Sequence, residues 1–209
     1  MDSTLRGIIE KFRDYLYNQN GNAIISFEEI AAKTGYPVGV ISKYAANEAE
    51  LVEKVLDYER HSFEEIFNIY TFDGVNAIDV LLMVSKEVKD KFIDISPSVT
   101  FVLKHHFPEI YHEHFIRRRD FIFEKIQLNL SKGIRQGMYR DDLSVELIAR
   151  LYLSRLIDLH NPDFFPAEEF SIDTIFKEMF ESLIRSIAKP EGLAYFENKK
   201  KDYGFGQQQ

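Results

Sequence analysis

The stretch IAAKTGYPVGVISKYAANEAEL, residues 30–51, carries the pattern of two short helices joined by a tight turn. Gly35 is placed to end the first helix, because glycine readily adopts the left-handed conformation that closes helices. Pro37 suits the first turn of the next helix, where its missing N–H costs little. A further helix start is indicated at Asn47. The stretch therefore predicts a helix-turn-helix, a motif whose second helix enters the major groove of DNA.

The residues before this stretch complete a small helical head. Apolar residues recur at helical spacing between residues 5 and 18. Ser26 and Glu29 form a capping box, in which the hydroxyl accepts from the amide of Glu29 while the Glu29 carboxylate reaches back. We expect a three-helix head that, with the start of a linking fourth helix, covers residues 1–62.

Composition favours helices throughout the chain. The 209 residues include only 10 glycines and 6 prolines, both of which break helices, and 45% of residues are apolar. Strand signals are weak, with few alternating runs and no Asn-Gly or Asp-Gly hairpin turn between them. The sequence predicts an all-α protein of about nine helices, with a helical body over residues 63–197 and a disordered tail over 198–209.

Several classes of protein are disfavoured by what the sequence lacks. It contains no cysteine, which fits a reducing cytoplasm, and no apolar run long enough to span a membrane. No signal peptide is recognisable at the first residues. No nucleophile elbow, phosphate-binding glycine loop, zinc-protease motif or dinucleotide fingerprint occurs. We therefore expect a cytoplasmic protein that is not an enzyme, contacts no membrane, and carries no cofactor or resident metal.

The charge of the chain counts against tight nucleic-acid binding. The net charge is −8, and residues 1–60 carry seven basic and ten acidic side chains, a net of −3. Between Tyr36 and Tyr44, where bases would be read, Lys43 is the one charged residue. Affinity for phosphates is set by the charges on the contacting face. An acidic chain can therefore still carry a small DNA-binding head with few basic residues.

The stretch resembles the N-terminal signature of the TetR/AcrR family of bacterial transcription regulators. Ala31 and Gly39 are small where two helices of such a motif are expected to pack closely. The resemblance continues in order along the chain through residues 105–111, 117–122, 133–142 and 187–196. The signature positions that match are Ile30, Ala31, Gly35, Gly39, Ile41, Tyr44, Glu50 and Leu51.

The resemblance implies a set of DNA contacts. Lys43 would bond a guanine edge or a phosphate, Tyr44 would give its hydroxyl to a phosphate, and Val38 or Val40 would touch a thymine methyl. Glu48 departs from the family, which usually has lysine there, and it would repel a phosphate. The expected contact residues are Ser26, Pro37, Val38, Val40, Ser42, Lys43 and Tyr44.

The resemblance also assigns the body two roles, ligand binding and dimerisation. An aromatic-lined cavity would suit an apolar or aromatic effector, although plain core packing explains any single ring as well. The candidate pocket residues are Phe92, Phe101, Phe107, Phe115, Phe121 and Tyr152. Wide apolar faces on the last two body helices predict a homodimer interface formed by Leu153, Leu156, Ile157, Ile172, Ile175, Phe176, Met179, Phe180 and Leu183.

Three functions stay open on the sequence. The first is a repressor that a small effector releases from its double-stranded operator. The second is a dimeric small-molecule-binding protein of the same fold whose DNA binding is weak or lost, as Glu48 and the acidic head suggest. The third is a helical metal-binding protein that uses the histidines between residues 105 and 114, because imidazoles and carboxylates bind zinc.

Overall fold

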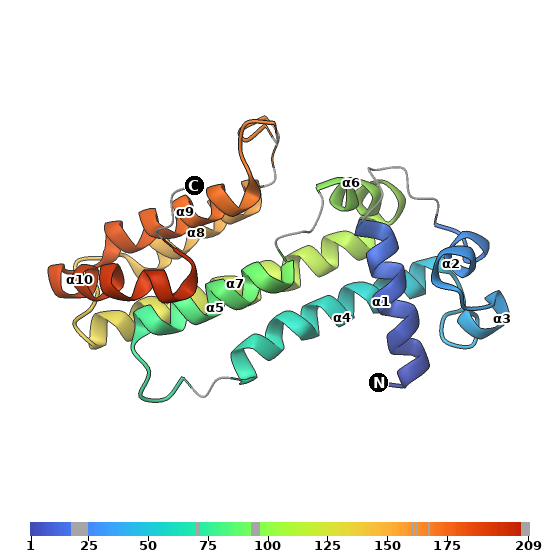
Figure 1. Ribbon diagram of the computed structural model, residues 1–209, viewed down its shortest axis with the longest axis horizontal. Coiled ribbons are helices and arrows are strands. Elements are labelled where there is room, and N and C mark those ends of the chain that lie inside the picture. The colour runs from blue at the N-terminus through green and yellow to red at the C-terminus, as the bar shows by residue number, and fades with distance from the viewer. Residues whose placement is uncertain are drawn as a thin grey trace. The chain divides into compact units, whose positions relative to one another are not determined.

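A computed structural model describes residues 1–17, 25–69, 72–92, 97–159, 161, 163–166 and 168–205. Over these residues the fold is all-α, as the sequence predicts (Figure 1). One helix more than expected is present, because residues 190–199 form a separate helix. The elements are α1 (Ser3–Tyr17), α2 (Phe27–Thr34), α3 (Val38–Ile41), α4 (Glu48–Ile69), α5 (Ala77–Phe92), α6 (Pro97–His106), α7 (Pro108–Arg135), α8 (Val145–Asp158), α9 (Ile172–Ile187), α10 (Pro190–Lys199) and the 3-10 helix η1 (Lys200–Tyr203).

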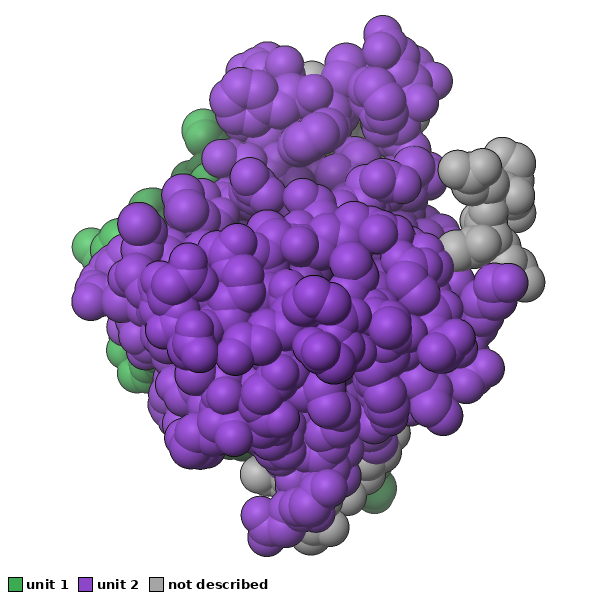
Figure 2. Space-filling view, turned by 90° about the vertical axis from the view of Figure 1, so that its left-hand side faces the viewer, with its two compact units in different colours: residues 1–65, 94–118 green, residues 66–93, 119–209 purple. Residues whose placement is uncertain are grey.

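The chain divides into two compact units, which Figure 2 colours separately. Unit 1 contains residues 1–65 and 94–118, and unit 2 contains residues 66–93 and 119–209. The division inside α4 falls close to the expected end of the head at residue 62. Val102 and Leu103, from the range expected for the body, are buried in the core of unit 1. No described helix has both the length and the apolar character that a bilayer span requires.

The core of unit 1 is formed by the apolar faces of the short helices and the first turns of α4. Phe12, Ile30, Ile41 and Leu51 are fully buried together there. Gly35 ends α2 with a φ of 76°, and its N–H donates to the carbonyl of Ala31 at 2.9 Å. The glycine stop that the sequence predicts is thus present, and it lets the chain reverse into α3.

The apolar stripe of α9 lies in the core of unit 2. Because α9 packs against α8 and α10, its apolar face is covered within the chain. Spacing indicates an apolar face but does not identify its cover, and a contribution of this stripe to a dimer interface stays a prediction. The stripe residues that are buried are Ile175, Phe176, Met179, Phe180 and Leu183, and on α8 Leu153 is buried as well.

The end of the described chain also differs from the expected disordered tail. Lys199 ends α10, η1 follows, and Phe205 is 2% exposed. The Phe205 ring stacks on Phe180 with a centroid distance of 4.7 Å. An aromatic anchor therefore orders residues 198–205 despite the lysine run, and residues 206–209 lie outside the described residues.

Candidate nucleic-acid interface

The N-terminus of α2 is capped from two places in the chain. The Ser26 hydroxyl accepts from the Glu29 amide at 3.2 Å, which confirms the first half of the capping box. The Glu29 carboxylate instead pairs with Lys33 at 3.6 Å. The amide of Phe27 donates to Oε1 of Glu48, 21 residues further on, at 3.1 Å. The first turn of α4 is thereby joined to the start of α2.

The second helix of the motif, α3, is a single turn. Pro37 precedes it, and its carbonyl accepts from the amides of Val40 at 2.8 Å and Ile41 at 3.1 Å. The Ser42 hydroxyl donates to the carbonyl of Val38 at 2.9 Å. Gly39 has open space around it, so the expected close packing at this position is absent. An exposed Gly39 leaves room for another molecule to approach the backbone of α3.

The structure groups six of the seven expected DNA contacts on α3, on Pro37 before it and on the turn after it. Pro37, Ser42 and Lys43 are exposed, whereas Val38, Val40 and Tyr44 are half-buried. Ser26, the seventh, lies beside the amide of Phe27 that Glu48 holds. These six residues thus form one short surface on which Lys43 is the one cation.

Tyr44, an expected phosphate contact, already has a partner in the chain. Its hydroxyl donates to Oδ1 of Asp2 at 2.8 Å. The same carboxylate oxygen caps α1 by accepting from the amides of Thr4 at 2.8 Å and Leu5 at 3.2 Å. The pKa of Asp2 is lowered chiefly by the hydrogen bond from Tyr44, and the same bond raises the pKa of Tyr44.

Most cations of residues 1–60 are occupied within the head. Arg13 pairs with the buried Glu59 at 2.9 Å, and Lys11 donates to the carbonyl of Thr34 at 2.9 Å. Arg6, Lys33, Lys54 and Arg60 each pair with a carboxylate on their own helix. Lys43 has no hydrogen bond or ion pair among the described residues, so it is the cation best placed to meet a phosphate or a base.

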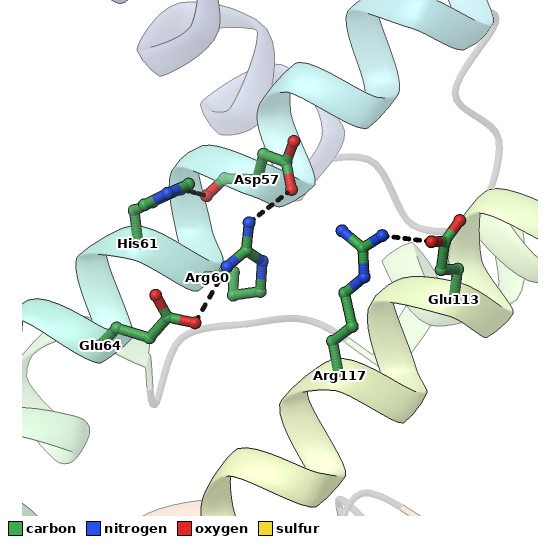
Figure 3. Close-up of polar contacts among 6 residues, drawn as sticks. All are labelled: Asp57, Arg60, His61, Glu64, Glu113 and Arg117. Atoms are coloured by element: carbon green, nitrogen blue, oxygen red, sulfur yellow. Dashed lines mark hydrogen bonds and ion pairs between the residues drawn. The ribbon is translucent and has the colours of Figure 1, made fainter.

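A second polar cluster lies between α4 and α7 in unit 1, and the sequence alone did not reveal it. Arg60 pairs with Asp57 at 3.0 Å and with Glu64 at 2.9 Å, while Arg117 pairs with Glu113 (Figure 3). Two guanidinium groups from helices far apart in sequence face a small cleft that His114 also lines. Arg60 and Arg117 are far apart in the sequence, and no local pattern of residues indicates that they lie at the same cleft.

His114 is neutral at pH 7 in this cleft. Burial, followed by the positive charge of Arg118 and Arg60, lowers its pKa to about 4. Of the four neighbouring histidines, His105 and His106 are exposed with their rings edge to face at 5.0 Å. Across the part of the chain that the structure describes, no three His, Cys, Asp or Glu side chains converge to hold a metal ion.

The expected ligand-pocket residues are divided between the two units. Phe107 and Phe115 belong to unit 1, where Phe115 stacks on Tyr111 with a centroid distance of 6.3 Å. Phe121 and Tyr152 belong to unit 2. The assignment of these rings to a ligand pocket stays a prediction. The remaining two side chains, those of Phe92 and Phe101, lie outside the described residues.

Besides Leu128 on α7, the large apolar side chains that stay exposed among the described residues of unit 2 are on α8 and the segment after it. Leu147 and Leu151, one helical turn apart, are 55% and 50% exposed, and Ile157 is 44% exposed. Phe164 and Phe170 add exposed rings. Of the expected interface residues, Ile157 belongs to this set, whereas Leu156 and Ile172 are half-buried. Spacing alone did not single out Leu147 and Leu151.

The fold is shared with solved structures of transcription regulators, although no protein-family model and no curated protein matches the sequence. A TetR transcription regulator from Haloarcula marismortui is 16% identical, with a TM-score of 0.72 over 90% of this chain and 100% of that one. The TetR family protein CprB from S. coelicolor A3(2) is 15% identical, with a TM-score of 0.72 over 96% of each chain. The fatty acid degradation regulator FadR from Bacillus halodurans is 11% identical, with a TM-score of 0.69 over 88% of this chain and 96% of that one. The chain therefore has the all-α fold of TetR-type regulators.

Proposed function

We propose that this protein is a ligand-responsive transcription regulator of the TetR type that binds operator DNA as a homodimer. The observation that carries the proposal is the helix-turn-helix closed at Gly35, with Lys43 exposed and unpaired among the described residues. The shared fold with TetR-type regulators supports it. Lys43 would contact a base edge or phosphate, and Val38 and Val40 would offer apolar contacts to thymine methyls.

Repression released by a small molecule is the proposed mode of action. A symmetric dimer would present two heads to half-sites about 34–36 Å apart, one helical turn of DNA. An effector that prefers a conformer with another spacing would release the operator. The coupling is typically about 1–3 kcal/mol, because a ligand shifts the balance only by its differential affinity. The many rings of the body favour an apolar or aromatic effector.

The test is a titration of the purified protein against DNA from upstream of its own gene, at 50 and 200 mM salt. Saturable, sequence-selective binding that weakens as salt rises is expected. Lys43→Ala should weaken binding and reduce the salt slope by about 0.9, the value of one lost phosphate contact. The matched control is Lys199→Ala, an exposed cation on α10 in unit 2. Equal effects of the two substitutions would contradict the assignment of Lys43.

A second function is favoured by one observation, the occupation of phosphate-contacting donors by carboxylates of the chain. A protein of this fold with weak DNA binding would still dimerise and bind its small molecule. It would show no saturable DNA binding at 50 mM salt while remaining a folded dimer. The same titration therefore separates the two functions.

A further inference from the structure

The N-terminal helical head contains two hydrogen-bond donors of the kind that proteins use to hold DNA phosphates. Backbone amides at a helix N-terminus and tyrosine hydroxyls are both common phosphate contacts. Here they are the amide of Phe27, at the start of α2, and the hydroxyl of Tyr44, in the turn after α3. Each lies at one edge of the helix-turn-helix. If they had no partner within the chain, both could donate to the DNA backbone.

Both donors are held by carboxylates that come from outside the helix-turn-helix. Oε1 of Glu48, the first residue of α4, accepts from the amide of Phe27 at 3.1 Å. Oδ1 of Asp2, before α1, accepts from the hydroxyl of Tyr44 at 2.8 Å. Asp2 is further fixed by its cap on α1. Each carboxylate therefore places a negative charge where a phosphate oxygen would accept.

We infer that Asp2 and Glu48 set the selectivity of the head by occupying two positions that DNA phosphates would otherwise take. This inference rests on the proposed DNA binding. Non-specific binding is almost entirely electrostatic, whereas specific binding also draws on base contacts. Blocking phosphate positions therefore weakens binding to unrelated DNA more than binding to the operator. Lys43 is left to carry most of the attraction to the backbone.

The inference is tested with two variants that remove a charge and keep the shape. In Glu48→Gln and Asp2→Asn the neutral oxygen that remains accepts more weakly than a carboxylate, so a phosphate can displace it from Phe27 or Tyr44, and Asn remains a good N-cap for α1. The matched control is Glu65→Gln, which removes the same charge from an exposed site near the other end of α4. Each protein is titrated against the upstream DNA and against an unrelated duplex of equal length, at 50 and 200 mM salt.

The expected result is tighter binding to both duplexes, with the larger gain on the unrelated one. Both variants should steepen the salt slope, because removing a carboxylate charge from the head strengthens its attraction to the backbone phosphates. The double variant should show both changes. Glu65→Gln should alter the affinities less and leave the slope near that of the parent protein.

The outcomes separate the inference from the proposed function. If the parent protein binds the upstream DNA selectively and the two variants behave like Glu65→Gln, the inference fails and the regulator stands. If the parent binds weakly and the double variant gains salt-dependent binding, the inference is supported. If neither binds any duplex at 50 mM salt while circular dichroism shows folded helices, the proposed function and the inference both fail.

Discussion

The ring of Tyr139 fills the space where a Cβ on Gly133 would lie, so the loop after α7 packs directly on the last turns of that helix. The Tyr139 hydroxyl then donates to Oδ1 of Asn129 at 3.2 Å, and Nδ2 of Asn129 donates to the carbonyl of Ala77 at 2.8 Å. One buried chain of contacts thus joins α7, this loop and the start of α5.

Gly133→Ala is expected to destabilise the protein by about 1–3 kcal/mol, the usual cost of overpacking a well-filled core. The added methyl group would overlap the Tyr139 ring, which is fully buried and has no room to move aside. Gly39→Ala is the control, because a Cβ there meets nothing within 4 Å. Urea unfolding followed by circular dichroism measures both changes, and equal free energies of unfolding would contradict the packing argument.

The sequence could predict contacts made within a few residues, but not those made across the chain. The Ser26 cap and the Gly35 stop follow from local backbone chemistry, and both are present. Glu48 was recognised only as a charge that would repel phosphate. Its bond to Phe27 crosses 21 residues and depends on how α2 meets α4, which no spacing rule encodes.

The same limit applies to α9. Its regular apolar stripe correctly indicates one face that must be covered. Periodicity does not say whether the cover is another helix of the same chain or a second copy. In the structure the cover comes from unit 2 itself, and Phe180 at its centre is fully buried. Which apolar side chains stay exposed to a partner depends on the folded structure, and the spacing of residues in the sequence does not give it.

The stability of the protein should fall as pH is lowered from about 6.5 toward 4, in part because of His114. Its pKa is lowered to about 4 in the folded protein, so the unfolded chain takes up the proton first. The contribution is complete above pH 6.5 and amounts to no more than about 3 kcal/mol. The charged groups around it are Arg60, Arg117, Arg118, Glu53, Asp57 and Glu113.

His114→Gln removes this titration and should flatten the fall in unfolding free energy between pH 6.5 and 5. His112→Gln, an exposed site on the same helix, is the matched control. Chemical unfolding at several pH values measures the slope. An unchanged slope in His114→Gln would show that the cleft does not disfavour the charged imidazole.

Phe205 should be a structural anchor and not part of a dispensable tail. Phe205→Ala is expected to cost about 3–5 kcal/mol, the usual range for removing a buried phenyl ring, because it leaves Phe180 without its stacking partner. Leu128→Ala, at a side chain that is 56% exposed on α7, should change stability by less than about 0.5 kcal/mol. Thermal unfolding distinguishes the two. A small effect of Phe205→Ala would mean that the end of the chain is not held in solution.

Dimerisation should depend on the exposed face of α8 and not on the α9 stripe. Leu147 and Leu151 lie one turn apart and present adjacent apolar surface, which a second copy related by a two-fold axis would cover. Replacing both with glutamate would place like charges opposite each other across such an axis. The variant is therefore expected to be a folded monomer in sedimentation equilibrium, whereas the parent protein sediments as a dimer.

Leu128→Glu is the matched control for this experiment, because it adds a charge at a comparably exposed leucine on another helix. A monomeric double variant should also lose affinity for a two-half-site operator, since a single head keeps only one half of the contacts. Retention of the dimer by the α8 variant, with dissociation by Leu128→Glu, would place the interface on α7. Dimers of both variants would exclude each of these faces as the main contact.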